Sequence, residues 1–147
     1  STYAPVPRKF EAGTQNISGT PTLKNALSLA REIADSEEIA LSQKAIVEFM
    51  LEALGSDRRI RLYGVPDAEF GKIPLFSFSV EHCHHEDLAL ILDKMGIAVR
   101  SGQMCAEPLM DRFGVTGMLR VSFAPYNTLQ EAEYFMESLN KAICMLM

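Results

Sequence analysis

The sequence predicts an α+β fold in which a small sheet is covered by helices. Apolar residues recur with a helical period in two segments near the start of the chain and in a long segment at its end, and runs with strand-like alternation lie between them. A chain of 147 residues is long enough to bury one hydrophobic core. This order of helices and strands is typical of α+β domains.

Two helices are expected before the first strand. Residues 1–19 have no periodic pattern and predict an extended, irregular lead-in. Thr20 and Pro21 predict the first helix, because threonine caps helix N-termini and proline is favoured in the first turn. Ser36 predicts the start of the second helix and Gly55 its end. The apolar residues that share one face of these helices are Leu23, Ala26, Leu27, Ala30, Ile33 and Ala34 in the first and Ile39, Ile46, Phe49, Met50 and Ala53 in the second.

Strands and further helices are expected after the second helix. The strands cover residues 59–63, 75–80, 97–101 and 118–123, with a turn at 64–67. Helices are expected to end at Gly96 and Gly114, and a last helix follows Thr128, which forms a capping-box pattern with Glu131. The inward positions of the last helix are Leu129, Ala132, Phe135, Met136, Leu139, Ile143 and Leu146.

Composition narrows the class of protein. The chain is 48% hydrophobic and 22% charged with a net charge of −5, which gives no indication of binding to nucleic acid or to an anionic membrane surface. No apolar run approaches the roughly 18 residues that a membrane span requires, and residues 1–19 show no signal-peptide pattern. Three cysteines without framework spacing favour a reducing, cytoplasmic location over a disulfide scaffold.

Cys105 is the first candidate for chemistry. It lies in a segment that Gly102 and Pro108 bracket, directly after a predicted strand that ends near Arg100. Loops held by a rigid sheet are common places for reactive side chains, whereas most free cysteines are small buried hydrophobic residues. The loop context favours a nucleophilic thiol at Cys105, and the apolar last helix predicts a core position for Cys144.

Arg100 and Arg120 are candidates for binding an anion. In the last predicted strand, Arg120 alternates with Leu119 and Val121, and it therefore projects from the opposite face. Arg100 likewise alternates with the apolar residues of the preceding strand. Both could be solvated surface arginines, but neither has an acidic neighbour in the sequence, which favours an external carboxylate.

Other patterns carry weaker indications. All three histidines lie in the run at residues 82–85 together with Cys83, but adjacent side chains cannot all face one ion, and no spaced Cys or His pair completes a zinc site. We therefore expect a solvated loop before a helix at Glu86, and no metal. The glycine-rich phosphate-binding motifs are absent from the sequence, although Gly13 and Thr14 could offer an N–H group and a hydroxyl to a phosphate.

Taken in order, five segments resemble one known family. They are residues 10–16, residues 96–102, the RxGxxCAxPL loop at 100–109, residues 120–123 and residues 126–128. The chain closely resembles the C-terminal part of the pyridoxal-phosphate-dependent cysteine desulfurases, also called selenocysteine lyases, in the class V aminotransferase superfamily. The RxGxxCAxPL loop is the most specific element and is similar to that of the short-loop branch, group II. The resemblance extends over essentially the whole chain, and a full family member is two to three times longer.

The resemblance implies a fold and a parent reaction. The fold would be the small C-terminal domain of a fold-type I enzyme, with a small, mainly antiparallel sheet and helices packed on it. Residues 1–19 would be the end of a large domain, and residues 20–147 the small domain. The parent enzyme would convert L-cysteine, or L-selenocysteine, to L-alanine and pass the sulfur to an acceptor protein for iron–sulfur cluster assembly.

The resemblance also implies roles for individual residues. Cys105 would be the nucleophile that carries a persulfide, and Arg120 would bind the substrate carboxylate. Arg100 would lie beside the active-site loop. Gly13 and Thr14 would reach the phosphate of pyridoxal phosphate in the neighbouring subunit of a homodimer.

The sequence differs from the family pattern at two points, and two alternative functions remain open. Gln103 and Met104 stand where family members often have two histidines, and none of the lysines lies in the motif that binds the cofactor covalently. We therefore expect this chain alone to be inactive, and residues 1–19 to be poorly ordered or taken up by a neighbouring chain. The alternatives are another class V enzyme, such as an aminotransferase or a kynureninase-like hydrolase, and a stand-alone sulfur-relay or binding module.

Overall fold

The computed structural model describes residues 2–65, 67 and 71–147. Ser1 and Pro66, the latter in the expected turn at 64–67, lie outside the described residues. The chain divides into two compact units, one up to Ser36 and one over Glu37–Met147, and each is described here by itself.

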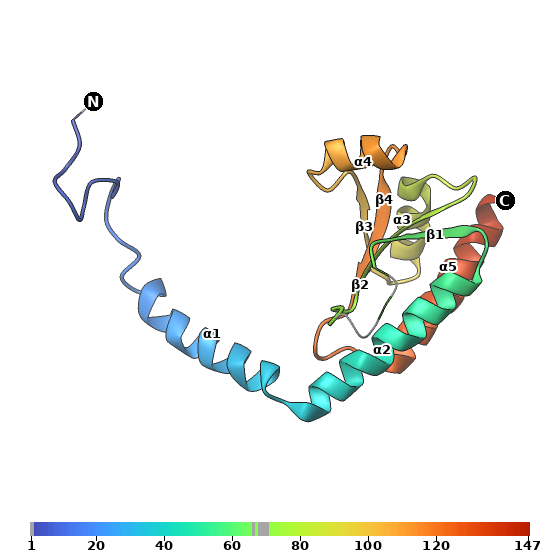
Figure 1. The fold of residues 1–147 in the computed structure, drawn as a ribbon, viewed down its shortest axis with the longest axis horizontal. Helices are drawn as coiled ribbons and strands as arrows, with labels where there is room; N and C mark the ends of the chain where they lie inside the picture. The colour runs from blue at the N-terminus through green and yellow to red at the C-terminus, as the bar shows by residue number, and fades with distance from the viewer. Residues whose placement is uncertain (1, 66, 68–70) are drawn as a thin grey trace. The chain divides into compact units, whose positions relative to one another are not determined.

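The first unit contains one helix, α1 (Gly19–Ala34), after a segment of turns (Figure 1). The helix begins two residues earlier than predicted, because Asn16 organises its start. The Asn16 side chain accepts a hydrogen bond from the backbone N–H of Gly19 at 2.8 Å, and the Thr20 hydroxyl donates to the Asn16 carbonyl at 2.7 Å. Of the described residues, none in α1 is buried, and its apolar positions Leu23 and Leu27 are exposed.

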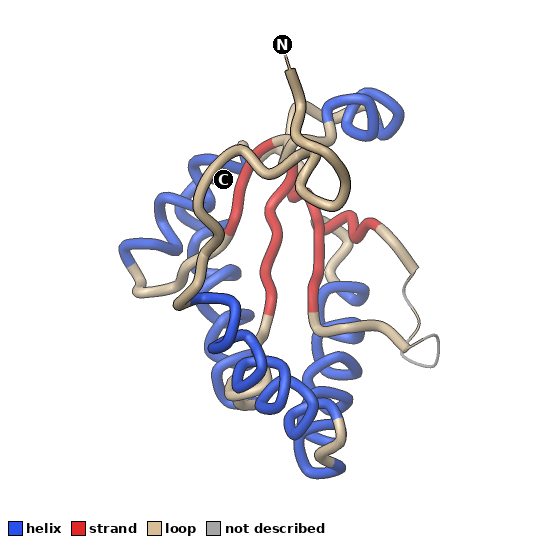
Figure 2. Tube along the Cα trace, turned by 90° about the vertical axis from the view of Figure 1, so that its left-hand side faces the viewer, coloured by secondary structure: helices blue, strands red, loops and turns tan. Residues whose placement is uncertain are grey.

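The second unit is an antiparallel sheet with helices, which confirms the predicted α+β class and the small antiparallel sheet. The strands run in the order β1-β2-β4-β3, and Figure 2 shows them side by side. The helices and strands of this unit are α2 (Glu37–Ser56), β1 (Ile60–Tyr63), β2 (Leu75–Val80), α3 (His85–Lys94), β3 (Arg100–Gly102), α4 (Glu107–Phe113), β4 (Met118–Ser122) and α5 (Leu129–Leu146).

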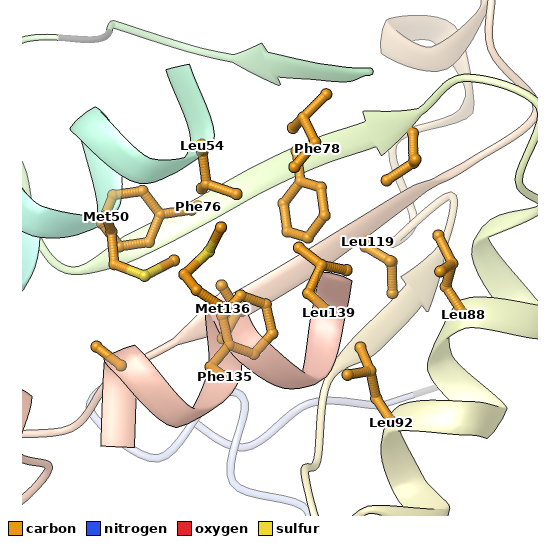
Figure 3. Packing of buried hydrophobic residues seen from close by; sticks show 14 of the residues in the cluster. Met50, Leu54, Phe76, Phe78, Leu88, Leu92, Leu119, Phe135, Met136 and Leu139 are labelled. Carbon is orange, nitrogen blue, oxygen red and sulfur yellow. The ribbon is translucent and has the colours of Figure 1, made fainter. Parts of the chain in front are cut away.

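The core lies between one face of the sheet and the helices α2, α3 and α5 (Figure 3). In β2, Phe76, Phe78 and Val80 are buried, as the alternation predicts, while Ser77 and Ser79 point to the other face. Each helix adds aliphatic, methionine or phenylalanine side chains to the same cluster. The labelled core residues in Figure 3 are Met50, Leu54, Phe76, Phe78, Leu88, Leu92, Leu119, Phe135, Met136 and Leu139.

The capping box predicted for the last helix is confirmed at the start of α5. The Thr128 hydroxyl accepts from the Glu131 N–H at 3.3 Å, and the Glu131 carboxylate accepts from the Thr128 N–H at 2.7 Å. This backbone hydrogen bond, with further bonds from Asn127 and Thr128, lowers the pKa of Glu131.

Three predictions about position were wrong. Cys144 is exposed, because it lies four residues after the exposed Asn140 and so shares the outward face of α5. The third strand begins at Arg100 and not at Ile97, since pairing with β4 starts at the Arg100–Arg120 register. Leu129 also remains partly exposed at the N-terminal end of α5.

The core makes a first prediction about stability. Phe78 is completely buried and stacks edge-on with Phe135 at a centroid distance of 6.4 Å. Phe78→Ala should therefore lower the free energy of unfolding by about 3–5 kcal/mol, measured by urea denaturation. Phe10→Ala, at a residue that is 83% exposed in the first unit, is the control and should change it little. Equal losses from both substitutions would contradict the assignment of this core.

His85, the first residue of α3, packs closely against the residue before β4. Its ring lies against Gly117 so tightly that a β-carbon at that position would collide with it. Its Nδ1 atom is buried and has no hydrogen-bond partner among the described residues. Burial lowers the pKa of His85 below 6.5, the nearby His84 lowers it further, and Glu86 and Asp87 act in the opposite direction.

Stability should therefore depend on pH through His85. Above its ordinary pKa of 6.5, the histidine is neutral in both the folded and the unfolded chain, and its contribution to stability is fully present. As the pH falls below that value, the unfolded chain binds the proton first, so stability falls until the lower folded-state pKa is passed. The difference in unfolding free energy between wild type and His85→Gln should change over this pH window.

Candidate functional site

The cysteine of the predicted loop lies in a tight turn between β3 and α4. The Ala106 N–H donates to the Gln103 carbonyl at 3.0 Å, and the two residues between them have positive φ angles, 56° at Met104 and 60° at Cys105. This is the geometry of a type I′ turn, whose central positions are normally Asn or Gly. Left-handed backbone costs residues with a β-carbon roughly 1–2 kcal/mol each. The sequence thus holds its loop cysteine in a strained turn.

The residues on either side of Cys105 hold this turn against the domain. Met104 and Ala106 are half-buried and pack against a second apolar cluster, while the Cys105 side chain between them is exposed. The buried members of this cluster are Tyr63, Met110 and Met118, and Phe113 packs against them. The thiol is therefore presented outward by a turn whose flanking side chains point inward.

Arg120 and Arg100 lie directly opposite each other on β4 and β3. The register of the sheet continues this row through Ser77 on β2 to Tyr63 on β1. All four residues belong to the face of the sheet that the helices of the core do not cover, because their strand neighbours supply that core. The structure thus brings together the two arginines that the sequence singled out.

No ion pair among the described residues involves either arginine. Two guanidinium groups on adjacent strands repel each other, since like charges directly opposite in a sheet are destabilising. By contrast, Arg59 binds Asp57 with a contact of 2.6 Å, and this bond lowers the pKa of Asp57. Arg100 and Arg120 are therefore available for an anion from outside the chain.

A cavity of about 440 Å³ lies between the Tyr63, Ser77 and Arg120 part of this row and the cysteine turn. Arg120 and Lys72 provide positive charge in its wall, and Ser77 provides a hydroxyl. The rest of the wall is largely apolar and includes Met104 and Phe113. A small molecule with a carboxylate fits this combination of charge and apolar surface.

The structure also shows where the weaker candidates lie. Gly13 and Thr14 are exposed and belong to the first unit, whereas the site of Cys105 and the arginines is built within the second. The side chain of His84 accepts a hydrogen bond from the Glu86 N–H at 3.4 Å and so caps α3. Within the part of the chain that the structure describes, no three His, Cys, Asp or Glu side chains could hold one metal ion.

Helices of membrane-spanning length and apolarity are not found in residues 2–65, 67 and 71–147.

Sequence reasoning missed three groups in the cavity, Tyr63, Lys72 and Ser77. The signal for Ser77 was its alternation with Phe76 and Phe78, which already placed it on the face away from the core. The pairing of β2 with β4 was needed to set it beside Arg120.

Relatives and solved structures agree on the family. A probable cysteine desulfurase of Vibrio cholerae is 38% identical over 151 residues, which cover 99% of this chain and 35% of that protein. The cysteine desulfurase CsdA of Escherichia coli is 34% identical over 140 residues, 95% of this chain and 33% of that protein. This chain therefore spans about a third of the length of these relatives.

The fold matches solved cysteine desulfurases as well. The crystal structure of CsdA from Escherichia coli superposes with a TM-score of 0.78 and 32% identity, over 96% of this chain and 34% of that one. The apo cysteine desulfurase of Thermococcus onnurineus gives a TM-score of 0.80 and 33% identity, over 95% and 34% of the two chains. Residues 1–135 match the family described as Aminotransferase class-V. The chain belongs to this family, and the resemblance to cysteine desulfurases is confirmed.

Proposed function

We propose that this chain is the C-terminal domain of a cysteine desulfurase whose full-length form converts L-cysteine to L-alanine. The observation that carries the proposal is the exposed Cys105 thiol in a strained turn beside a cavity that contains Arg120. Residues held in rarely populated backbone conformations concentrate at functional sites. The similarity to cysteine desulfurases supports the same conclusion.

Arg120 binds the carboxylate of the substrate in this proposal. It is half-buried in the cavity wall, and its planar guanidinium can form two parallel hydrogen bonds to a carboxylate. Arg100 lies opposite it and is more exposed, so it adds positive charge beside the loop without taking the same place. An amino acid held in this way keeps its side chain free, and the residues on either side of Cys105, Met104 and Ala106, line the same cavity.

Cys105 takes the sulfur atom as a thiolate. A sulfur–sulfur bond forms between Cys105 and the substrate sulfur while the substrate carbon–sulfur bond breaks. The electron pair of the broken bond remains with the carbon, which gains a proton to give alanine, and Cys105 keeps a persulfide.

The family relationship implies pyridoxal phosphate in the full-length protein, and the residues of this chain fit only part of that role. Lys72 is the one lysine in the cavity wall among the described residues, and it does not follow a histidine as the family motif requires. We assign Gly13 and Thr14 to the phosphate of the neighbouring subunit in a homodimer. When bound, pyridoxal phosphate supplies the electron sink for breaking the carbon–sulfur bond.

The proposal extends to the partners of the full-length protein. A persulfide on an exposed cysteine is accessible to an acceptor protein, which would receive the sulfur for iron–sulfur cluster assembly in the cytoplasm.

In this proposal, residues 1–19 are the end of the large domain and residues 20–147 are the small domain, and this chain alone is inactive. A class V aminotransferase or kynureninase-like enzyme would need Arg120 but not the thiol, and a stand-alone relay module would need no cofactor.

Replacement of Cys105 tests the reaction. In the full-length protein loaded with pyridoxal phosphate, Cys105→Ala should abolish alanine and sulfide release from L-cysteine, because the sulfur then has no acceptor. Cofactor absorbance should be retained. Cys144→Ala is the matched control, since that thiol is also exposed but lies on α5, and it should keep wild-type activity. Activity that survives Cys105→Ala would favour the enzymes that need no thiol.

Replacement of Arg120 tests the binding of substrate. Arg120→Lys keeps the charge but loses the guanidinium fork, so KM for L-cysteine should rise roughly tenfold to a hundredfold, the effect of one hydrogen bond to a charged group. Arg58→Lys, at an exposed residue outside the cavity, should leave KM unchanged. The assignment is wrong if KM stays at the wild-type value in Arg120→Lys while the protein remains folded.

A further inference from the structure

The turn that carries Cys105 has no residue suited to its backbone conformation. Both central positions of the type I′ turn are occupied by residues with β-carbons, Met104 and Cys105, at φ angles of 56° and 60°. A backbone hydrogen bond across the turn joins Ala106 to Gln103. Since isolated peptide segments without Asn or Gly rarely adopt this turn, contacts elsewhere in the domain must hold it.

The side chain of Met104 provides such a contact. It packs against the second apolar cluster, which contains Tyr63 from β1, Met118 from β4 and Met110 from α4. The same side chain lines the cavity that holds Arg120. The flexible thioether of methionine fills irregular apolar space well and interacts favourably with aromatic rings such as Tyr63.

We propose that Met104 is a positioning residue for sulfur transfer: its half-buried side chain, packed against the cluster of Tyr63, Met110 and Met118, holds the left-handed turn that presents the Cys105 thiol. This inference rests on the proposed function of Cys105 as the sulfur acceptor. It assigns a role to a residue that itself cannot donate or accept a proton. α4, which contributes Met110, follows the turn in the chain and lies at one end of the strands β3 and β4 (Figure 1).

The geometry explains why the contact matters for chemistry. A nucleophile must lie within bonding reach of the atom it attacks, and a displacement of about 1 Å can cost about a hundredfold in rate. Cys105 is exposed and is not a member of either apolar cluster among the described residues, so burial of its own side chain does not fix its position. The inward-pointing side chains on either side of it, of which Met104 is the larger, therefore hold the turn on which the thiol lies.

Three substitutions at Met104 and one control distinguish the effect of its side-chain contact from the effect of its backbone preference. Met104→Ala removes the apolar contact but keeps the β-carbon, and Met104→Gly removes the contact while favouring positive φ. Met104→Leu keeps an apolar side chain of similar volume. Met145→Ala is the matched control, because it removes a methionine side chain that is 67% exposed on α5.

The first readout uses this chain without cofactor. Amide hydrogen exchange of Ala106, measured by NMR, reports the hydrogen bond to Gln103 that closes the turn. We expect Met104→Ala and Met104→Gly to accelerate this exchange at least tenfold, with the exchange of core amides such as Leu139 unchanged. Met104→Leu and Met145→Ala should leave it at the wild-type rate. Wild-type protection of Ala106 in Met104→Ala or in Met104→Gly would overturn the proposal.

The second readout uses the full-length protein loaded with pyridoxal phosphate. The kcat for alanine formation from L-cysteine should fall roughly tenfold to a hundredfold in Met104→Ala and Met104→Gly, while KM changes by less than about twofold. Met104→Leu should keep kcat near the wild-type value. An unchanged kcat in variants that have lost protection of Ala106 would overturn the positioning role. A wild-type protein that forms no persulfide would overturn the proposed function, and amide exchange would then decide the role of Met104 in the turn independently.

Discussion

The antiparallel pairing of β2, β4 and β3 is the constraint on which the other features of the second unit depend. Because side chains alternate along a strand, one register fixes both faces of the sheet at once. Phe76 and Phe78 enter the core, and the same register puts Ser77 beside Arg120 on the other face. A slip of one residue between β2 and β4 would put Arg120 on the same face of the sheet as Phe76 and Phe78, so core stability also maintains the position of the arginine.

The helices provide stability on one side and leave the other side for chemistry. α2, α3 and α5 cover the core face, and the long capped α5 contributes the largest number of buried residues of any helix in this unit. α4 is short and belongs to the second apolar cluster through Met110. Its C-terminal Gly114 has a φ of 70°, a conformation that glycine adopts without strain and that ends the helix cleanly. The catalytic turn of the proposed enzyme therefore depends on a small cluster that is separate from the main core.

Local sequence patterns predicted much of this fold because their causes are local. The alternation in β2 and the capping box at Thr128 involve residues within a few positions of each other, and both were predicted correctly. The face of Arg120 followed from the same alternation. Non-local pairing was not predictable in this way, so the start of β3 at Arg100 and the opposition of the two arginines emerged only from the structure. The outward position of Cys144 depends on the rotation of α5 relative to the core, and the left-handed conformation of Met104 contradicts its intrinsic preference.

The opposition of Arg100 and Arg120 has a consequence for the edge of the sheet. β3 is three residues long and pairs only with β4 among the described strands, so few hydrogen bonds hold it against the repulsion between the two guanidinium groups. An anion that binds the pair neutralises this repulsion and stabilises the folded form by an amount that grows with the logarithm of the anion concentration once this exceeds the dissociation constant. Inorganic anions in a buffer would do the same, and added salt would screen the repulsion. The ionic composition of the solution therefore affects the stability of β3, the strand that leads into the cysteine turn.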